Sequence, residues 1–327
     1  MVDIHLHLGY PRTASTSLQW LLSGPSGLTL YLGKYPGGRL STPALSKMYR
    51  LLLPDRWKSN PSAVEEVSDL ARDFANKAKQ ELTQTGSEKI VLSDESWLNP
   101  FTHDVPRNLR VLEVLRDSFV RQFGSDFGEW KILIGARRQD QLLSSAYRFW
   151  NRSISLSHAS EKHFLESFLA DSEMCALFRF DAVAAMLDTM FDTQTSIYLY
   201  EDALLGSPTY SATLSSAFGV PHEVFSHLPV RNESTLVESR LSRLTGRLAD
   251  RAWPFVQRAP RSVQRKVVNS YASLEKSLKV EKEASLQRDV RQGCIERFRE
   301  SNQDLCVRLN RIPDATGYPA GDTGLNH

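Results

Sequence analysis

The first residues that could do chemistry form a short polar segment near the N-terminus. It carries one arginine and four hydroxyl side chains, between a Gly-x-Pro turn and the start of a 3.6-residue apolar period; its members are Gly9, Pro11, Arg12, Thr13, Ala14, Ser15, Thr16 and Ser17. At a helix N-terminus, backbone N–H groups lack intrahelical partners and the helix dipole is positive, so anions bind there. The segment therefore predicts a site for an anion, above all for a phosphate group.

Two common phosphate-binding motifs do not describe this segment. A Walker A loop needs a second glycine followed by Lys and Ser or Thr, but Ala14 and Ser15 stand at that place and no lysine is present. The spaced glycines of a dinucleotide-binding fingerprint are also missing. The alternative is an ordinary strand-to-helix turn in which Ser and Thr cap the helix.

Two more pairs of polar residues follow apolar runs of strand length. The pairs are Asp94-Glu95 after residues 89–93 and Arg137-Arg138 after residues 131–136. Residues 4–8 alternate apolar side chains with histidines, which predicts a strand before the first segment. Because ligands of open α/β sheets bind outside the carboxyl ends of the strands, we expect the three strand ends to form one site.

Taken together, the segments resemble the sulfotransferases that use 3′-phosphoadenosine 5′-phosphosulfate (PAPS). The pattern Gly9-x-Pro11-Arg12-Thr13-x-x-Thr16-Ser17-Leu18-Gln19 is similar to their 5′-phosphosulfate loop. Arg137, with Ser145 eight residues later, is similar to their 3′-phosphate motif. Ser93-Asp94-Glu95 is similar to the catalytic segment of the bacterial and glycan-modifying branch, where a glutamate replaces a histidine. The resemblance covers most of residues 2–310.

The resemblance implies how PAPS would be bound. The first segment would hold the 5′-phosphate, with the participation of Gly9, Pro11, Arg12, Thr13, Ala14, Ser15, Thr16 and Ser17. Arg137 and Ser145 would bind the 3′-phosphate. Arg138 is the alternative to Arg137, because neighbouring residues that leave a strand point to opposite sides. Ala14 stands where the family often has glycine, which suggests a slightly different local turn.

The resemblance also implies how the reaction would be catalysed. Glu95 would take the proton from the acceptor hydroxyl, and Asp94 is the alternative base. Arg12 would stabilise the charge that grows on the bridging oxygen as the S–O bond breaks, in place of the lysine that the family more often has. We expect PAPS as the donor, no metal ion, and a carbohydrate or a small hydroxylated metabolite as the acceptor.

Several alternatives stay open at this point. An ATP-dependent phosphotransferase of P-loop type would require Mg²⁺, but the missing Walker lysine argues against it. A non-catalytic nucleotide-binding protein would keep the fold without turnover. His5-x-His7 is superficially similar to the metal pair of amidohydrolase barrels, but two residues on one face of a strand explain it better. The stripe from Arg240 to Arg251 is either a solvated helix face or the wall of a groove for an acidic acceptor.

Strand patterns and helix patterns alternate along the chain. This order predicts an α/β fold, with a P-loop-like doubly wound parallel sheet flanked by helices. The expected strands are residues 4–8, 28–32, 89–93, 131–136 and 196–200, and the expected helices are 43–53, 61–84, 107–122, 140–150, 160–170, 178–190 and 281–309. We expect an α/β core at residues 1–234, a helical C-terminal region at 235–312 packed on the same domain, and a flexible tail at 313–327.

Composition limits the other classes of function. The chain has 327 residues, of which 41% are hydrophobic and 24% charged, and a formal net charge of +2, so a bulk electrostatic hold on nucleic acid is not indicated. No apolar run approaches the ~20 residues of a membrane span. Three cysteines without CxxC spacing argue against a disulfide framework or a structural zinc site. We expect a cytoplasmic protein without a signal peptide, and composition does not determine its oligomeric state.

Overall fold

The computed structural model describes residues 1–10, 12–22, 29–33, 63–99, 101, 105–150, 161–225 and 288–320. The described residues divide into two compact units. The first, called the sheet unit below, takes those within 1–137 and 180–225, and the second, the helical unit, takes those within 138–179 and 288–320. The helix expected at 43–53 and the arginine stripe from Arg240 to Arg251 lie outside the described residues.

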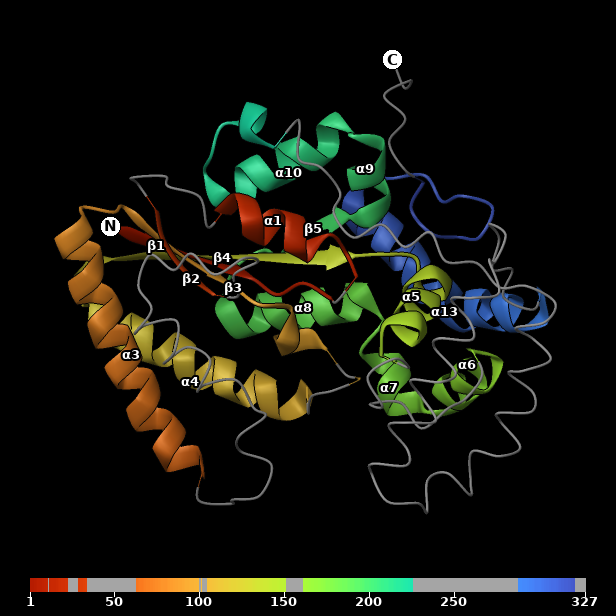
Figure 1. Ribbon diagram of the computed structural model, residues 1–327, viewed down its shortest axis with the longest axis horizontal. Helices are drawn as coiled ribbons and strands as arrows, with labels where there is room; N and C mark the ends of the chain where they lie inside the picture. Colours follow the sequence, from red (N-terminus) through yellow and green to blue (C-terminus); the bar gives the residue numbers. More distant parts are fainter. Residues whose placement is uncertain are drawn as a thin grey trace, which may run out of the picture. The chain divides into compact units, whose positions relative to one another are not determined.

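Five parallel strands form the described part of the sheet (Figure 1). They are β1 (Val2–His7), β2 (Thr29–Gly33), β3 (Lys89–Ser93), β4 (Phe127–Ala136) and β5 (Ser196–Leu199), in the order β2-β3-β1-β4-β5. Ile4 of the central strand β1 lies opposite Ile90 of β3 and Trp130 of β4. The predicted α/β class with a parallel sheet is confirmed.

Helices cover both faces of this sheet (Figure 1). On one face lie α1 (Ser15–Leu22), α9 (Tyr200–Leu205) and α10 (Pro208–Phe218), and on the other lie α3 (Ala63–Thr85), α4 (Val105–Phe123) and α8 (Phe180–Phe191). Short 3-10 helices follow some of these elements; they are η2 (Glu95–Leu98), η3 (Gly124–Asp126) and η5 (His222–Val224). The helices expected at 61–84, 107–122 and 178–190 match α3, α4 and α8, whereas α9 and α10 were not predicted.

Apolar side chains fill both interfaces between the sheet and its helices. On one side, Leu18 of α1, Tyr198 of β5 and Phe218 of α10 belong to one buried cluster. On the other side a run of aromatic rings extends from α3 to α8, with centroid separations of 5.8 Å for Phe74–Phe119, 5.7 Å for Phe119–Trp130 and 5.1 Å for Trp130–Phe191. Because both faces are covered, the polar residues of the central strand are buried as well, as His5 and His7 show.

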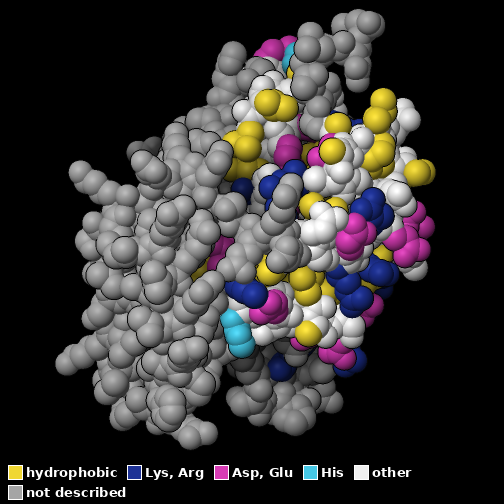
Figure 2. Space-filling model, turned by 90° about the vertical axis from the view of Figure 1, so that its right-hand side faces the viewer, with side chains coloured by type: hydrophobic (Ala, Val, Ile, Leu, Met, Phe, Trp, Pro, Cys, Tyr) yellow, Lys and Arg dark blue, Asp and Glu magenta, His cyan; other side chains and the backbone are white. Residues whose placement is uncertain are grey.

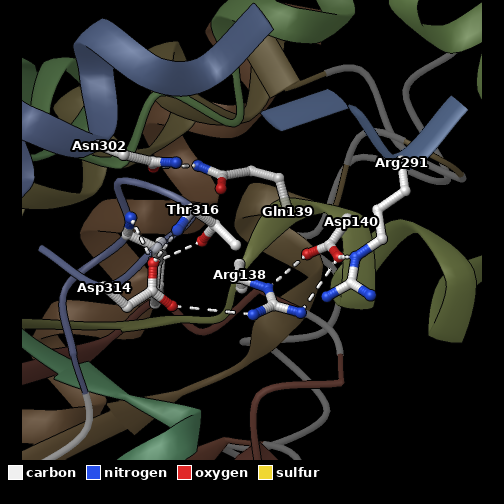
Figure 3. A network of polar contacts seen from close by, with 8 residues as sticks. Arg138, Gln139, Asp140, Arg291, Asn302, Asp314 and Thr316 are labelled. Atoms are coloured by element: carbon white, nitrogen blue, oxygen red, sulfur yellow. Dashed lines mark hydrogen bonds and ion pairs between the residues drawn. The ribbon is translucent and has the colours of Figure 1, made fainter. Parts of the chain in front are cut away.

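The helical unit consists, in its described part, of α5 (Gln139–Trp150), α6 (Glu161–Ala170), α7 (Ser172–Ala176) and α13 (Arg288–Leu309). A polar network joins the start of α5 to α13 (Figure 3). The Asp140 carboxylate, only 3% exposed, accepts hydrogen bonds from Arg138 Nε at 2.7 Å and from Arg291 Nε at 2.9 Å. These buried contacts group residues 138–150 with the C-terminal helix, whereas the sequence predicts a core that is continuous to residue 234.

The chain folds back on itself after α13. Oδ1 of Asp314 accepts hydrogen bonds from the backbone N–H and the hydroxyl of Thr316, at 2.7 and 2.6 Å, and from the backbone N–H of Tyr318 at 3.2 Å. Tyr318 is buried, and Pro313 and Pro319 form a β-bridge. Residues 313–320 therefore differ from the flexible tail expected there, because aspartate turns and the burial of one aromatic ring hold them. The rest of that expected tail lies outside the described residues.

The charges of the described residues are mixed. On the face drawn in Figure 2, Lys and Arg side chains are interspersed with Asp and Glu among the coloured residues. This mixture accords with the small formal net charge of +2. In the described ranges, no helix combines the length and the apolar character that crossing a membrane would require.

Candidate functional site

The three polar segments lie at the carboxyl ends of neighbouring strands. β1 is hydrogen-bonded to β3 on one side and to β4 on the other, so their ends meet at one edge of the sheet. Backbone hydrogen bonds continue past the strands, from Leu8 N–H to the Leu133 carbonyl at 2.9 Å and from Asp94 N–H to the His7 carbonyl at 3.2 Å. Arg12, which follows β1, therefore shares this edge with the residues that follow β3 and β4.

The loop between β1 and α1 has an unusual backbone. Arg12 has a φ of 73° and Ala14 a φ of 67°, which is the left-handed region that glycine tolerates best. A residue with a Cβ atom costs about 1–2 kcal/mol there. Ala14 thus adopts a conformation that glycine would hold at lower cost, and its carbonyl accepts the first helical hydrogen bonds from Ser17 and Leu18.

The hydroxyl groups of the loop face the interior. Thr13 and Ser15 are buried, and both donate to the Tyr10 carbonyl, at 2.6 and 3.4 Å. Ser17 is buried as well. The side chains of Thr13 and Ser15 therefore hold the loop together from within, and contact of the loop hydroxyls with an anion stays a prediction. Pro11 and the Thr16 side chain lie outside the described residues.

Asp94 and Glu95 are neighbours with different surroundings. Asp94 is buried and caps η2, because its Oδ1 accepts the Ser96 N–H at 2.8 Å. Glu95 is partly exposed, and its Oε2 accepts a hydrogen bond from Gln19 Nε2 of α1 at 2.7 Å. Gln19 therefore holds the Glu95 carboxylate beside the helix that the loop begins.

Arg137 and Arg138 also differ. Arg137 Nη1 donates to the Arg12 carbonyl at 3.1 Å, and its guanidinium lies 4.1 Å from the centre of the Tyr200 ring. Arg138 belongs to the helical unit, where it pairs with Asp140 at 2.7 Å and with Asp314 at 3.8 Å. The structure thus brings Arg12, Glu95 and Arg137 to one edge of the sheet unit.

Two further predicted site residues, Ser145 and Gly9, are both buried. Ser145 lies in α5 and is buried within the helical unit. Gly9 is buried in the loop, where a Cβ atom would stand 2.5 Å from Ser15 Oγ and 3.1 Å from His7 Nε2. Only glycine fits at this position without displacing its neighbours.

Sequence reasoning missed a buried network beneath the loop. His7 Nδ1 lies 2.8 Å from Ser93 Oγ and its Nε2 lies 3.3 Å from the Tyr198 hydroxyl. The Tyr198 hydroxyl and Thr13 Oγ1 both lie beside Gly135, where a Cβ atom would stand 2.4 Å from the first and 2.7 Å from the second. Burial lowers the pKa of His7 from 6.5 to about 4 and raises the pKa of Tyr198 to about 12, so both are neutral at pH 7. The sequence signal for this network was His5 and His7, the polar residues that alternate with apolar ones in β1. A strand that is covered on both faces must hydrogen-bond its polar side chains within the protein.

Comparison of the chain with protein-family models, with curated proteins and with solved structures finds no match. Within the described ranges, no group of three or more His, Cys, Asp or Glu side chains is arranged to hold a metal ion. The geometry of the sheet edge is therefore the basis for a functional proposal.

Proposed function

We propose that the protein is a PAPS-dependent sulfotransferase with a P-loop-like core. The observation that carries the proposal is the meeting of a helix N-terminus, two arginines and a partly exposed carboxylate at one sheet edge. Arg137 contacts the loop through the Arg12 carbonyl, and Glu95 contacts α1 through Gln19. Transfer of a sulfuryl group from a phosphosulfate requires these same elements, namely anion binding, positive charge near the leaving group and a base for a hydroxyl.

The loop would bind the 5′-phosphate mainly through its backbone. The hydroxyls of Thr13 and Ser15 are used within the loop, whereas the helix dipole of α1 and the N–H groups of its first turn favour an anion. Arg137 would bind the 3′-phosphate of the same nucleotide. Its stacking on Tyr200 supports this assignment, because an aromatic ring restrains a guanidinium without using its N–H donors.

The chemistry is a displacement at sulfur. The oxygen of the acceptor hydroxyl forms a bond to sulfur while the bond from sulfur to the 5′-phosphate oxygen breaks, and adenosine 3′,5′-bisphosphate leaves. Glu95 takes the hydroxyl proton, and Arg12 stabilises the charge on the departing phosphate. The capping bond of Asp94 makes it the weaker candidate for the base, since its carboxylate is already used in the turn. The acceptor is a carbohydrate or a small hydroxylated metabolite.

A thermal-shift experiment tests the donor assignment. We expect adenosine 3′,5′-bisphosphate to stabilise the protein more than 5′-AMP or ATP with Mg²⁺, because only the bisphosphate offers a 3′-phosphate to Arg137. Arg137→Ala should weaken bisphosphate binding by about 10- to 100-fold, since a charge-assisted hydrogen bond is lost. Arg138→Ala is the matched control and should retain the ligand-induced shift, because Asp140 and Asp314 already occupy that guanidinium.

The possible results separate the alternatives. A larger shift with ATP and Mg²⁺ than with the bisphosphate would favour a phosphotransferase. Equal shifts with all three nucleotides would contradict the 3′-phosphate assignment. A bisphosphate-specific shift without sulfuryl transfer to any of a panel of hydroxylated acceptors would favour a non-catalytic nucleotide-binding protein.

A further inference from the structure

The Glu95 carboxylate is held by an amide that is itself buried. Gln19 of α1 is only 2% exposed, and its Nε2 donates to Glu95 Oε2 at 2.7 Å. An ionised carboxylate only accepts hydrogen bonds, so this contact requires the Gln19 amide to turn its nitrogen toward Glu95. Because the partly exposed glutamate is bonded to a side chain that solvent does not reach, its position is set from within the sheet unit.

The backbone that carries Glu95 is held from the other face of the sheet, on which α4 lies (Figure 1). Asn108 of α4 is fully buried, and its Nδ2 donates to the Ser96 carbonyl at 3.0 Å and to the Trp97 carbonyl at 2.9 Å. These bonds hold η2, so they fix the point at which the Glu95 side chain leaves the backbone. Gln19 then fixes where the carboxylate of that side chain lies.

Gln19 also sets the distance between the candidate base and the anion-binding end of α1. It lies four residues after Ser15, where α1 begins, and therefore about 6 Å along the axis on the same side of the helix. Helical side chains lean toward the N-terminus, so the Gln19 amide is directed back toward the loop. About one helical turn thus separates the backbone amides that would bind the 5′-phosphate from the residue that holds the carboxylate.

We propose that Gln19 is a positioning residue, which holds the Glu95 carboxylate in place to take the proton of the acceptor hydroxyl. This role rests on the proposed function, because it requires Glu95 to be the base. Gln19 does not touch the reacting atoms and acts only through Glu95.

A neutral amide suits this task. An arginine or lysine at the same place would stabilise the ionised carboxylate and make it a weaker base, whereas an amide orients it without adding a charge. A carboxylate has about four acceptor positions, so one bond from Gln19 does not exclude a second from the acceptor hydroxyl.

The chain offers a matched control in Gln139 of α5. Gln139 is also 2% exposed, and its Nε2 donates to Asn302 Oδ1 at 2.8 Å within the helical unit. Gln19→Leu and Gln139→Leu each replace one buried amide by an apolar side chain of similar size. Only the first removes a bond to Glu95.

Sulfuryl transfer from PAPS to a panel of hydroxylated acceptors, together with bisphosphate binding, tests the two variants in the full chain. In Gln19→Leu we expect kcat to fall about tenfold, as the loss of one hydrogen bond to a charged group predicts, while bisphosphate affinity stays within about twofold. Gln139→Leu should keep both quantities within about twofold of the wild type. In the Glu95→Gln background, Gln19→Leu should lower kcat no further, because the effects of residues that act through one group do not add.

The outcomes separate this role from a structural one. An equal fall of bisphosphate affinity and kcat in Gln19→Leu would show that Gln19 only supports α1, and would overturn the proposal. A further fall of kcat in the Glu95→Gln background would overturn it as well, because Gln19 would then act on another group. Should Gln19→Leu not fold, Gln19→Asn keeps the amide but is one methylene shorter, and the same fall in kcat is expected.

The outcomes also separate the role of Gln19 from the proposed function. If the wild type transfers sulfuryl groups and Gln19→Leu matches it, Gln19 has no positioning role, although the proposed function stands. If the wild type transfers none to any acceptor of the panel, the proposed function fails and the role of Gln19 fails with it.

Discussion

At the scale of single residues, Asp94 and Glu95 show how two adjacent carboxylates come to differ. The strand β3 ends just before them, and η2 begins with Glu95, so the two side chains leave the backbone in different directions. The Asp94 carboxylate accepts a hydrogen bond from the Ser96 N–H, whereas the Glu95 carboxylate accepts one from Gln19 and stays partly exposed. Both side chains are carboxylates, so it is their surroundings that make Asp94 a helix cap and Glu95 a candidate base.

The first prediction concerns this difference. Glu95→Gln keeps the shape and a bonding partner for Gln19 but removes the base, so kcat should fall by about 10²- to 10⁴-fold while bisphosphate binding persists. Asp94→Ala should instead remove the cap and lower the free energy of unfolding by about 1 kcal/mol, with a smaller effect on kcat. Steady-state kinetics and urea unfolding of the two variants check both statements. A greater loss of kcat in Asp94→Ala would reverse the assignment.

The sequence predicted which of these residues would meet, but not what each side chain would do. Arg12, Glu95 and Arg137 follow strands, and parallel strands with helical crossovers place such residues at one edge. The inward direction of the Thr13 and Ser15 hydroxyls could not be predicted, because both bond to the carbonyl of Tyr10, whose ring packs against Phe180 far along the chain.

At the scale of elements, the central strand β1 carries two buried histidines. Its alternation of apolar residues with His5 and His7 is typical of a strand with one solvated face. In the structure both faces are covered, and His5 Nδ1 donates to the Ala217 carbonyl at the end of α10 while His7 joins the network under the loop. Burial lowers the pKa of each from 6.5 to about 4.

These pKa values predict how stability depends on pH. Below pH 6.5 the unfolded chain takes up a proton on each histidine, while the folded protein takes up none until about pH 4, so stability is lost as pH falls through this window. Between pH 7.5 and 5 the two histidines together should lower the free energy of unfolding by about 4 kcal/mol. Urea unfolding across this range measures the effect.

A variant of one histidine isolates its share. His5→Gln retains a donor for the Ala217 carbonyl but does not titrate, so about half of the pH dependence should disappear. His7 is less suitable, because a change there also breaks its contacts with Ser93 and Tyr198. An unchanged dependence in His5→Gln would show that other groups titrate in this window.

The helix α10 illustrates why some elements were missed. Its Ser- and Thr-rich sequence has little apolar period, but Ser207 caps it, Pro208 stands at its first turn and Gly219 ends it with a φ of 58°. Capping residues in this order are a sequence signal for a helix even when the period is weak. The capping residues therefore predict α10 where the apolar period alone does not.

At the scale of the whole molecule, the order of the chain does not follow the division into units. The chain leaves the sheet unit after Arg137 and returns to it at Phe180, and the segment between belongs with α13. Asp140 is at the centre of the contacts that make this grouping, since it binds arginines from both parts of the helical unit. A change of composition near residue 235 could not reveal such a grouping.

Asp140 therefore carries a prediction about stability. Asp140→Asn leaves Arg138 and Arg291 without their shared buried charge, and the free energy of unfolding should fall by about 3 kcal/mol. Urea unfolding measures the loss, and hydrogen exchange should locate it in residues 139–150 and 288–309. Asp117→Asn removes a half-exposed partner of Arg116 and is the matched control, with an expected loss below about 1 kcal/mol. Equal losses in the two variants would show that the Asp140 network does not hold the unit together.

The sequence by itself determined the α/β class, the ranges of most described strands and long helices, and the polar residues that follow three strands. These are local properties, because period and turn chemistry depend on residues a few positions apart. Only the tertiary structure decided the central place of β1, the inward turn of the Thr13 and Ser15 hydroxyls, and the pairing of Arg138 with Asp140 while Arg137 faces the loop. Each of these depends on burial, which turns a polar side chain from a surface group into one that must be hydrogen-bonded within the protein.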